Sequence, residues 1–463
     1  MQCPAWTVES PPYSLGILAA ILRAAGHKVK CFDFNIATYN YCKSQGASVP
    51  EGITSESWIM DQRGNVWYEK ESVSAFVKNH HKFIESMVDE IGAFESQIVG
   101  FSTQSTSKFF SLALAARFKE KKNTTPIIFG GPLVFKNCYG PDILKDHAFL
   151  DAISFSEADT ALPAFLDLFE QSGFLQPVPG FAVRSASGEI TVGNEPGVVD
   201  DLDKIPYADY TDFSGEHYTK QLIPIATSRG CINRCAFCAE SPHWRRFRRR
   251  SAENIVREII MQLGQYPQTN EFWFNDSLIN GDIAMLEELC DLIISRGLKI
   301  RWGGQAMIRK EMNVSFLKKM KAAGCYLISY GVESGSDAML KLMRKGYAAA
   351  LAERVLHDTH AVGIDVIFNI MVGFPGEDDK RFRETKDFVR RCRQYASHIE
   401  LPTYLLLKGS FVFNHLEDFA IAPVDYSNED WQLNWKTKDN TNTYQIRKDR
   451  WAELWRLVGS PQS

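Results

Sequence analysis

The sequence predicts an α/β protein in which an open parallel sheet is followed by a partial (β/α)6 TIM barrel and a short C-terminal tail. Short apolar, strand-like runs alternate with helical stretches of about ten to fifteen residues, which is typical of βαβ units. The alternation stops in a segment rich in Pro, Gly and Asp and restarts at Leu222. The 463 residues suffice for about three domains of roughly 150 residues. We expect a first domain over 1–175, a connector over 176–222, a barrel over 223–410 and an extension over 411–463.

The N-terminal part begins with a helix over residues 14–27, which carries apolar residues at helical spacing and ends at Gly26. Ligands of open parallel sheets bind beyond the carboxyl ends of the strands, here near Ser102-Thr103 and Gly130-Gly131. A glycine pair is equally compatible with a plain tight turn. The other expected elements are strands over 28–35, 97–103, 126–131 and 149–155, and helical stretches over 72–93, 109–122 and 158–171.

The second half contains six further strand-like runs with helices between them. One such helix covers 251–264, with Ser251 as its N-cap. Six repeats are too few for a closed eight-stranded barrel, so we expect a partial barrel whose chemistry lies where strands end. The tail contains four tryptophans, for which packing is the default role. The six runs cover 222–228, 271–276, 299–305, 326–333, 366–374 and 400–407.

Composition narrows the possible classes of function. Hydrophobic residues make up 45% and charged residues 23%, and the formal net charge is -4, which argues against a nucleic-acid or membrane-surface protein. The arginine-rich run over 244–250 is the strongest basic cluster, and contacts with an anionic substrate or cofactor explain it better than nucleic acid. No signal peptide or membrane span is visible, and scattered cysteines indicate a reduced, cytoplasmic protein. Common hydrolase and NTPase motifs are missing.

Three of the ten cysteines fall within eight residues, directly after the first strand of the predicted barrel. Cys231, Cys235 and Cys238 in such a loop can converge on one iron–sulfur cluster or one soft metal. A structural zinc site is the alternative, and it needs a fourth ligand, which His243 could supply. Three unrelated core cysteines are a further alternative.

The segment CINRCAFC resembles the CxxxCxxC pattern of the radical SAM superfamily, with Phe237 directly before the last cysteine. The resemblance implies a [4Fe-4S] cluster on Cys231, Cys235 and Cys238, with S-adenosyl-L-methionine chelated to the open iron. Reductive cleavage would then yield a 5′-deoxyadenosyl radical.

Further segments resemble the cofactor-binding strand ends of this superfamily, in the right order. GVESGSDAMLKLMRKG looks like its fourth strand end, VGFPGED like its fifth-strand turn, and FNDSLING loosely like the strand end near the methionyl amine. Arg309 is a plausible partner for the methionyl carboxylate, because a guanidinium grips a carboxylate with two hydrogen bonds. An ordinary surface ion pair is the alternative for Glu333 and Arg309. The residues implied are Asn275, Asp276, Arg309, Glu333, Ser334 and the backbone at Met371, Val372 and Gly373.

The N-terminal half resembles the Rossmann-like (flavodoxin-like) cobalamin-binding domain that precedes this barrel in one large subgroup. PPYSLGILAAILRAAGHKV, IVGFST, IIFGGP and FSEADTALPAF follow the order of that subgroup. Its first strand is short or missing here, Ser156 replaces a common glycine, and no DxHxxG motif marks a cobalt ligand. A Rossmann-like domain that binds nothing is the alternative. The residues implied to face cobalamin are Ser102, Thr103, Gln104, Ser105, Gly130, Gly131 and Glu157.

Together the resemblances imply a cobalamin-dependent radical SAM enzyme, with C-methyltransferase activity on an unactivated carbon of a natural-product or peptide-derived substrate. Its partners would be a small-molecule or peptide substrate and a reductant of the flavodoxin or ferredoxin type. The enzymatic alternatives are rearrangement, cyclisation or oxidation without methyl transfer, and methylthiolation of RNA. A zinc-stabilised binding protein is the non-enzymatic alternative.

Overall fold

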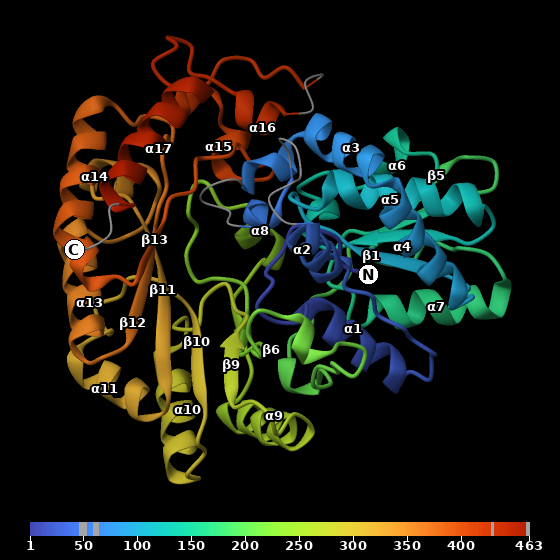
Figure 1. Ribbon diagram of the computed structural model, residues 1–463, viewed down its shortest axis with the longest axis horizontal. Helices are drawn as coiled ribbons and strands as arrows, with labels where there is room; N and C mark the ends of the chain where they lie inside the picture. The colour runs from blue at the N-terminus through green and yellow to red at the C-terminus, as the bar shows by residue number, and fades with distance from the viewer. Residues whose placement is uncertain (46–52, 59–63, 427–429, 460–463) are drawn as a thin grey trace. The chain divides into compact units, whose positions relative to one another are not determined.

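The computed structural model describes residues 1–45, 53–58, 64–426 and 430–459. The chain divides into two compact units, Met1–Gln221 and Leu222–Ser463. Each unit contains its own sheet and is described by itself (Figure 1).

The first unit is built on a five-stranded sheet in the order β1-β2-β3-β4-β5. The first three strands are parallel, whereas β4 and β5 are antiparallel. Buried nonpolar residues predominate in β2, β3 and β4, the central strands, as expected for strands covered on both faces. The strands are β1 (Val99–Ser102), β2 (Ile127–Gly130), β3 (Ala152–Ser154), β4 (Phe181–Arg184) and β5 (Ile190–Val192).

Seven α-helices accompany this sheet among the described residues of the first unit. The stretch expected to be helical over 72–93 forms two helices that meet at His80. The helices are α1 (Tyr13–Ala24), α2 (Phe34–Gln45), α3 (Lys70–Asn79), α4 (His81–Ala93), α5 (Lys108–Lys121), α6 (Asp142–Asp146) and α7 (Ala161–Ser172).

The strand expected over 28–35 is wrong. Only Asp33 pairs there, in a single bridge to Gln2, and Gln2 in turn bridges to Ser102. The physical reason lies in Asp33, whose carboxylate accepts the Ile36 amide at 3.1 Å and so begins α2 at Phe34. The first strand of the unit, which the sequence predicted to be short or missing, is likewise reduced to a bridge.

The segment expected as a connector over 176–222 falls within the first unit up to residue 221. Its hairpin supplies β4 and β5 to the sheet. Further along, Arg23 of α1 bonds the carboxylates of Asp209, at 2.5 Å, and Asp212, at 2.6 Å. These contacts join residues far apart in the chain, so composition alone did not reveal them.

The second unit is a six-stranded, wholly parallel sheet in the order β13-β12-β11-β10-β9-β6. Five of the six predicted strand runs coincide with strands, whereas the sixth, 400–407, overlaps β13 only at Glu400. The strands follow one another around the sheet in chain order. This is the partial barrel. The strands are β6 (Ile223–Ile225), β9 (Glu271–Phe274), β10 (Arg301–Ala306), β11 (Cys325–Glu333), β12 (Asp365–Ile370) and β13 (His398–Glu400).

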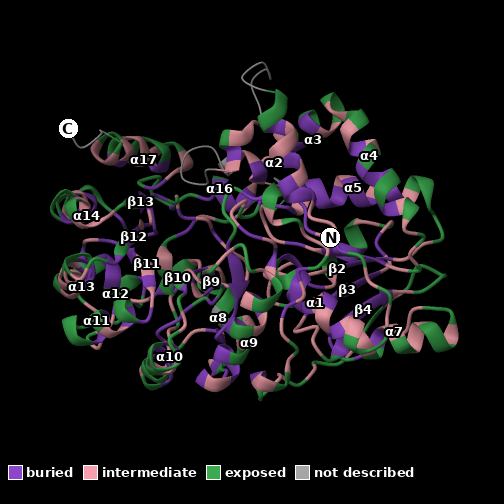
Figure 2. Cartoon of the chain, turned by 60° about the horizontal axis from the view of Figure 1, so that its bottom comes forward, coloured by how far each residue is buried: buried purple, intermediate pink, exposed green. Residues whose placement is uncertain are grey.

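Helices cover the outer face of this sheet, where Figure 2 shows buried strands and helices with exposed outer residues. Ser251 caps its helix as predicted, since its hydroxyl accepts the Asn254 amide at 3.1 Å. Trp302 stacks on Phe274 in the layer between sheet and helices, with ring centroids 4.8 Å apart. The helices are α8 (Glu240–Trp244), α9 (Ala252–Gln265), α10 (Ile283–Ser295), α11 (Val314–Ala322), α12 (Asp337–Leu342), α13 (Ala349–Ala361) and α14 (Asp379–Cys392).

The C-terminal extension forms α15 (Phe411–Asn414), α16 (Trp431–Asn434) and α17 (Tyr444–Val458). Trp431 and Trp435 are buried in one aromatic cluster with residues of the barrel. This packing matches the role expected for these two of the four tryptophans, whereas Trp451 and Trp455 are only partly buried.

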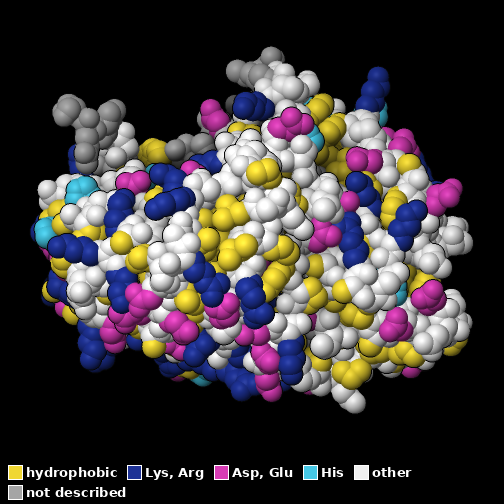
Figure 3. Space-filling view, turned by 90° about the horizontal axis from the view of Figure 1, so that it is seen from below, with side chains coloured by type: hydrophobic (Ala, Val, Ile, Leu, Met, Phe, Trp, Pro, Cys, Tyr) yellow, Lys and Arg dark blue, Asp and Glu magenta, His cyan; other side chains and the backbone are white. Residues whose placement is uncertain are grey.

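Within the described part of the chain, no helix is long and apolar enough to cross a membrane. The face seen in Figure 3 carries basic and acidic side chains intermixed. Within the arginine-rich run, Arg248 and Arg250 are buried, and Arg250 pairs with the buried Glu258. These two arginines therefore serve the fold and do not form part of a basic surface.

Candidate active site

The three clustered cysteines lie on a loop that leaves the carboxyl end of β6. A two-residue strand, β7 (Ser228–Arg229), pairs with β8 (Arg248–Arg249) and leads into this loop. Gly230 follows with φ +84°, and a Cβ there would lie 2.8 Å from the Arg246 carbonyl oxygen. Only glycine satisfies both conditions, so the turn before Cys231 depends on it.

Asn233 organises two of the three thiols. Its amide N–H donates to Cys231 Sγ at 3.4 Å, and its side-chain Nδ2 donates to Cys235 Sγ at 3.3 Å. Burial raises the pKa of Cys231 and of Cys235, and the positive charge of Lys345 opposes that rise. Hydrogen bonds to sulfur and a nearby cation are features that stabilise a thiolate once it forms.

The loop is anchored through the backbone of Ala236, which is fully buried. Its N–H donates to the Met343 carbonyl at 3.0 Å, and its carbonyl accepts the Val412 N–H at 3.0 Å. The cysteine loop is therefore held both by the barrel and by the C-terminal extension.

None of the ten cysteines, all of which lie in described residues, forms a disulfide. Among the described residues, no group of three or more His, Cys, Asp or Glu side chains is drawn together closely enough to hold a metal ion. Cys231, Cys235 and Cys238 thus share one loop, and their convergence on a cluster stays a prediction. The same observation applies to a zinc site completed by His243.

The structure separates the roles of Asn275 and Asp276, which follow β9. Asn275 is exposed, whereas Asp276 is buried and accepts the Thr227 N–H at 3.0 Å and the Ser228 hydroxyl at 2.7 Å. Burial raises the pKa of Asp276 to about 6, although these hydrogen bonds lower it. Asp276 therefore ties β9 to the segment that leads into the cysteine loop, and Asn275 is the one with an accessible side chain.

The Arg309 guanidinium forms hydrogen bonds and an ion pair with other residues of the barrel. Its guanidinium donates to the carbonyls of Asn280, at 2.7 Å, and Gly281, at 3.0 Å, and pairs with Glu311 at 3.3 Å. An ion pair, the alternative that the sequence left open, is thus present, and a role of Arg309 in binding the methionyl carboxylate stays a prediction.

Glu333 ends β11 in an unusual conformation. Its φ is +72°, and the pairing register with β12 shifts between Gly331 and Glu333. A non-glycine residue in the left-handed region is strained, and such strain concentrates at functional sites. The adjoining Ser334 is fully buried and shares a 2.9 Å hydrogen bond with Thr385, so its hydroxyl serves packing.

Two residues beside Glu333 were not predicted from the sequence. Lys345 Nζ lies 3.3 Å from Glu333 Oε1 and 5.7 Å from the centroid of Phe237. Tyr347 donates to the Val332 carbonyl at 2.8 Å. Lys345 stands twelve residues after Glu333, in the same quoted segment, but nothing in that spacing indicates that the chain folds back.

The backbone of Met371 to Gly373 leaves the end of β12. The Met371 N–H donates to the Glu333 carbonyl at 2.9 Å, and the Gly373 N–H donates to Glu377 Oε2 at 2.9 Å. The Val372 N–H donates to the Pro402 carbonyl, and the Val372 carbonyl accepts the Tyr404 N–H. Among the described residues, the Met371 carbonyl accepts no hydrogen bond from the protein, so it is the acceptor of this segment that is open to a ligand.

In the first unit, the ends of β1 and β2 lie side by side. The Thr103 N–H and hydroxyl both donate to the Gly130 carbonyl, at 2.7 and 2.8 Å. Gly131 has φ +92°, and a Cβ there would lie 2.6 Å from the Thr103 carbonyl oxygen. The N–H and hydroxyl of Thr103 therefore stabilise the fold. Gly131 is needed because the loops after β1 and β2 approach closely here.

The remaining predicted residues of this edge are partly accessible: Ser102, Gln104, Ser105, Gly130 and Glu157 are all of intermediate burial. The Ser102 hydroxyl lies 3.3 Å from that of Ser14. At the end of β3, Ser154 is 4% exposed, and its hydroxyl has no protein partner among the described residues. Ser154 was not predicted from the sequence, although a serine at a strand end was an available signal.

The comparison with known families decides the identity of the second unit. Residues 225–389 match the family model described as the radical SAM superfamily, and this range contains the cysteine loop, β9 to β12 and the Met371–Gly373 segment. Residues 225–389 form a radical SAM domain. This radical SAM protein is an enzyme, and S-adenosylmethionine and a [4Fe-4S] cluster are the cofactors of its superfamily.

Curated relatives of this radical SAM protein include several methyltransferases. An uncharacterized methyltransferase of Pyrococcus horikoshii is 22% identical over 337 residues, covering 69% of this chain and 72% of the relative. Cytidylyl-2-hydroxyethylphosphonate methyltransferase of Streptomyces wedmorensis is 23% identical over 297 residues, 55% of each chain. tRNA-2-methylthio-N(6)-dimethylallyladenosine synthase of Fusobacterium nucleatum is 23% identical over 321 residues, 66% of each chain.

Solved structures share the fold of the radical SAM protein over nearly its whole length. The cobalamin-dependent S-adenosylmethionine radical enzyme OxsB, with aqua-cobalamin and S-adenosylmethionine bound, has a TM-score of 0.68 at 17% identity and covers 97% of this chain. The methyltransferase TsrM of Kitasatospora setae, with cobalamin and a [4Fe-4S] cluster bound, has a TM-score of 0.65 at 14% identity and also covers 97%. The matches span 64% of OxsB and 86% of TsrM.

Proposed function

We propose that this enzyme is a cobalamin-dependent radical SAM methyltransferase that methylates an unactivated carbon of a small-molecule or peptide-derived substrate. The observation that carries the proposal is the placement of Cys231, Cys235 and Cys238 on one loop at the carboxyl end of β6, within the range that matches the superfamily. When bound, the cluster and S-adenosylmethionine supply an organic radical, and cobalamin supplies a methyl group. A flavodoxin or ferredoxin would supply electrons.

The donor set of the loop fits an iron–sulfur cluster. Three thiols with three and two residues between them are soft ligands that leave one iron open, whereas structural zinc requires a closed set of four. Asn233 supports this fit, because it already donates to Cys231 and Cys235. Hydrogen bonds to cluster sulfurs are among the means by which proteins tune a cluster.

The strand ends of the barrel would position S-adenosylmethionine. The open carbonyl of Met371 can accept a hydrogen bond from the adenine amino group. Asn275, exposed after β9, can accept one from the methionyl amine. Glu333 is held by Lys345 close to the cysteine loop, and its position supports contact with the ribose or the amine.

The first unit would bind cobalamin at the carboxyl ends of its parallel strands. Ser102, Gly130 and Ser154 end three neighbouring strands, and Gly131 allows the loops after β1 and β2 to approach closely at this edge. The Ser154 hydroxyl supports the fit, since a buried hydroxyl without a protein partner requires a ligand or an ordered water.

Reconstitution of the protein under anaerobic conditions tests the cluster. We expect about four irons per chain and a broad sulfur-to-iron absorption band in the native protein. Substitution of Cys231, Cys235 or Cys238 by Ala should abolish both signals. Cys290→Ala is the matched control, because Cys290 is fully buried in α10 outside the loop and should leave the iron content unchanged. A native protein with one zinc and no iron would refute the proposal.

Product analysis distinguishes methyl transfer from other radical chemistry. Methyl transfer should yield S-adenosylhomocysteine together with 5′-deoxyadenosine, because one S-adenosylmethionine supplies the methyl group and another the radical. Formation of 5′-deoxyadenosine alone would favour rearrangement, cyclisation or oxidation. Transfer of a methylthio group to RNA would instead add sulfur to the product, which mass spectrometry resolves.

A further inference from the structure

The C-terminal helix α17 lies alongside α14, the helix that follows the Met371–Gly373 segment (Figure 1). An exposed ion pair between Lys386 and Glu453 joins the two helices at their outer faces. Both α17 and the loop before it lie outside the range that matches the superfamily, which ends at residue 389. The tail is therefore an addition to the part of the barrel that the family model describes.

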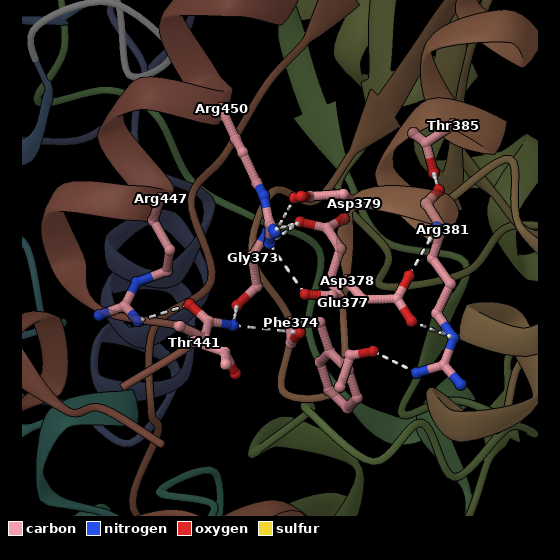
Figure 4. Close-up of polar contacts among 12 residues, drawn as sticks. Gly373, Phe374, Glu377, Asp378, Asp379, Arg381, Thr385, Thr441, Arg447 and Arg450 are labelled. Carbon is pink, nitrogen blue, oxygen red and sulfur yellow. Dashed lines mark hydrogen bonds and ion pairs between the residues drawn. The ribbon is translucent and has the colours of Figure 1, made fainter. Parts of the chain in front are cut away.

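Arg450 of α17 reaches the turn that follows β12 (Figure 4). Its guanidinium donates to the Glu377 carbonyl at 2.9 Å, lies 3.4 Å from Glu377 Oε2, and donates to Asp379 at 3.0 Å. Arg450 is 8% exposed and Glu377 is 5% exposed, so this is a buried ion pair. The same Glu377 Oε2 accepts the Gly373 N–H, which links the arginine to the end of the segment.

A second contact comes from the loop before α17. Asn442 is 1% exposed, and its Nδ2 donates to the Gly373 carbonyl at 2.9 Å and to the Phe374 carbonyl at 3.4 Å. Arg447, which is fully buried, holds Asn442 in place by donating to its Oδ1 at 3.0 Å. Both backbone groups of Gly373 are thus engaged, the N–H through Glu377 and the carbonyl through Asn442.

Gly373 also permits the close packing of the tail on the Met371–Gly373 segment. Its φ is +79°, and a Cβ at this position would be 2.3 Å from Arg447 Cγ. The backbone of the segment therefore packs directly on the stem of a tail arginine. A peptide in the left-handed region can change conformation when its hydrogen bonds are lost, because glycine tolerates many alternatives.

We propose that Arg450 and Asn442 are positioning residues for S-adenosylmethionine: they clamp Gly373 from the C-terminal tail and so orient the neighbouring Met371 carbonyl toward the adenine. The inference rests on the proposed function of the Met371–Gly373 segment. It adds that the tail, which the superfamily model does not cover, is required for tight cofactor binding.

The test compares variants of the reconstituted full-length protein by calorimetric titration with S-adenosylmethionine. Arg450→Met and Asn442→Ala should each raise the Kd about tenfold, equivalent to about 1.4 kcal/mol, while the iron content stays at the native level. Arg450→Lys keeps the charge and should recover part of the affinity. Glu453→Gln is the control, because it removes the exposed pair between α14 and α17 without touching the turn, and its Kd should match the native value.

A second measurement reports on the clamp without any cofactor. Amide hydrogen exchange of the peptide that contains Gly373 should be faster in Arg450→Met and in Asn442→Ala than in Glu453→Gln. Arg450→Met releases Glu377, which accepts the Gly373 N–H, and Asn442→Ala removes the donor to the Gly373 carbonyl. Faster exchange with an unchanged Kd would overturn the proposal and leave the clamp a purely structural feature. Equal loss of affinity in Glu453→Gln would also overturn it. A native protein that binds the cluster but no S-adenosylmethionine would instead refute the proposed function.

Discussion

Lys345 Nζ lies 3.3 Å from Glu333 Oε1, and both side chains are almost wholly buried at the end of β11. Burial alone would lower the pKa of Lys345, but the charge of Glu333 raises it above its ordinary value. The amine is thus a fixed positive charge beside the cysteine loop, whose thiols it influences. This pair joins two parts of the site that are separate in the sequence.

Removing one partner of the Lys345–Glu333 pair should lower the free energy of unfolding more than removing both. Lys345→Met leaves the Glu333 carboxylate buried without its cation, which typically costs about 3–5 kcal/mol. We expect a large fall in the midpoint of thermal unfolding, and partial recovery in the double variant Lys345→Met, Glu333→Gln. Thermal scans of the three proteins check this, and a double variant as unstable as the single one would contradict it.

Asp276 should make stability depend on pH. Because burial raises its pKa from 3.8 to about 6, the folded protein holds this proton more tightly than the unfolded chain. The stabilisation is complete below about pH 4 and is lost as pH rises through about 6, with a magnitude of order 1–3 kcal/mol. The difference in unfolding free energy between native protein and Asp276→Asn should therefore shrink from pH 4 to pH 7. A difference independent of pH would show that the group does not titrate there.

Gly373→Ala should disturb the barrel end more than an alanine at an open glycine. The new Cβ meets the Arg447 stem and requires φ +79°, so we expect lower thermal stability and weaker S-adenosylmethionine binding. Gly264→Ala is the control, since a Cβ there would meet nothing within 4 Å outside its own helix, and alanine favours the helix by about 0.5–1 kcal/mol. Equal effects from the two variants would contradict the prediction.

In the first unit, Ser154→Ala should affect cobalamin binding but not stability, whereas Thr103→Val should lower stability. The Ser154 hydroxyl has no protein partner among the described residues, so its removal should leave stability unchanged and reduce retention of cobalamin after gel filtration. The Thr103 hydroxyl donates to the Gly130 carbonyl, so Thr103→Val should lower stability by about 1 kcal/mol. Undiminished cobalamin retention in Ser154→Ala would contradict a role for this serine in binding.

Local sequence patterns predicted the elements of the barrel well, because each strand and helix is encoded by its own run of residues. The cap at Ser251 and five of the six predicted barrel strands are confirmed, whereas β13 overlaps its predicted run only at Glu400. The strand over 28–35 was wrong because Asp33 begins α2 and pairs only in a single bridge with Gln2. Pairing partners are a property of the whole unit, and an isolated run does not contain them.

By itself, the sequence determined the class of enzyme and the loop that carries its cysteines, because thiol spacing after a strand is a local property of the chain. Only the tertiary structure decided what the other site residues do. In the structure, Asp276 and Arg309 form hydrogen bonds with the protein backbone, and Lys345 pairs with Glu333. Asn442 contacts the Gly373 carbonyl directly, and Arg450 contacts Glu377, which binds the Gly373 N–H. These roles depend on contacts between residues far apart in the chain, and such contacts exist only once the parallel strands have brought their carboxyl ends to one edge.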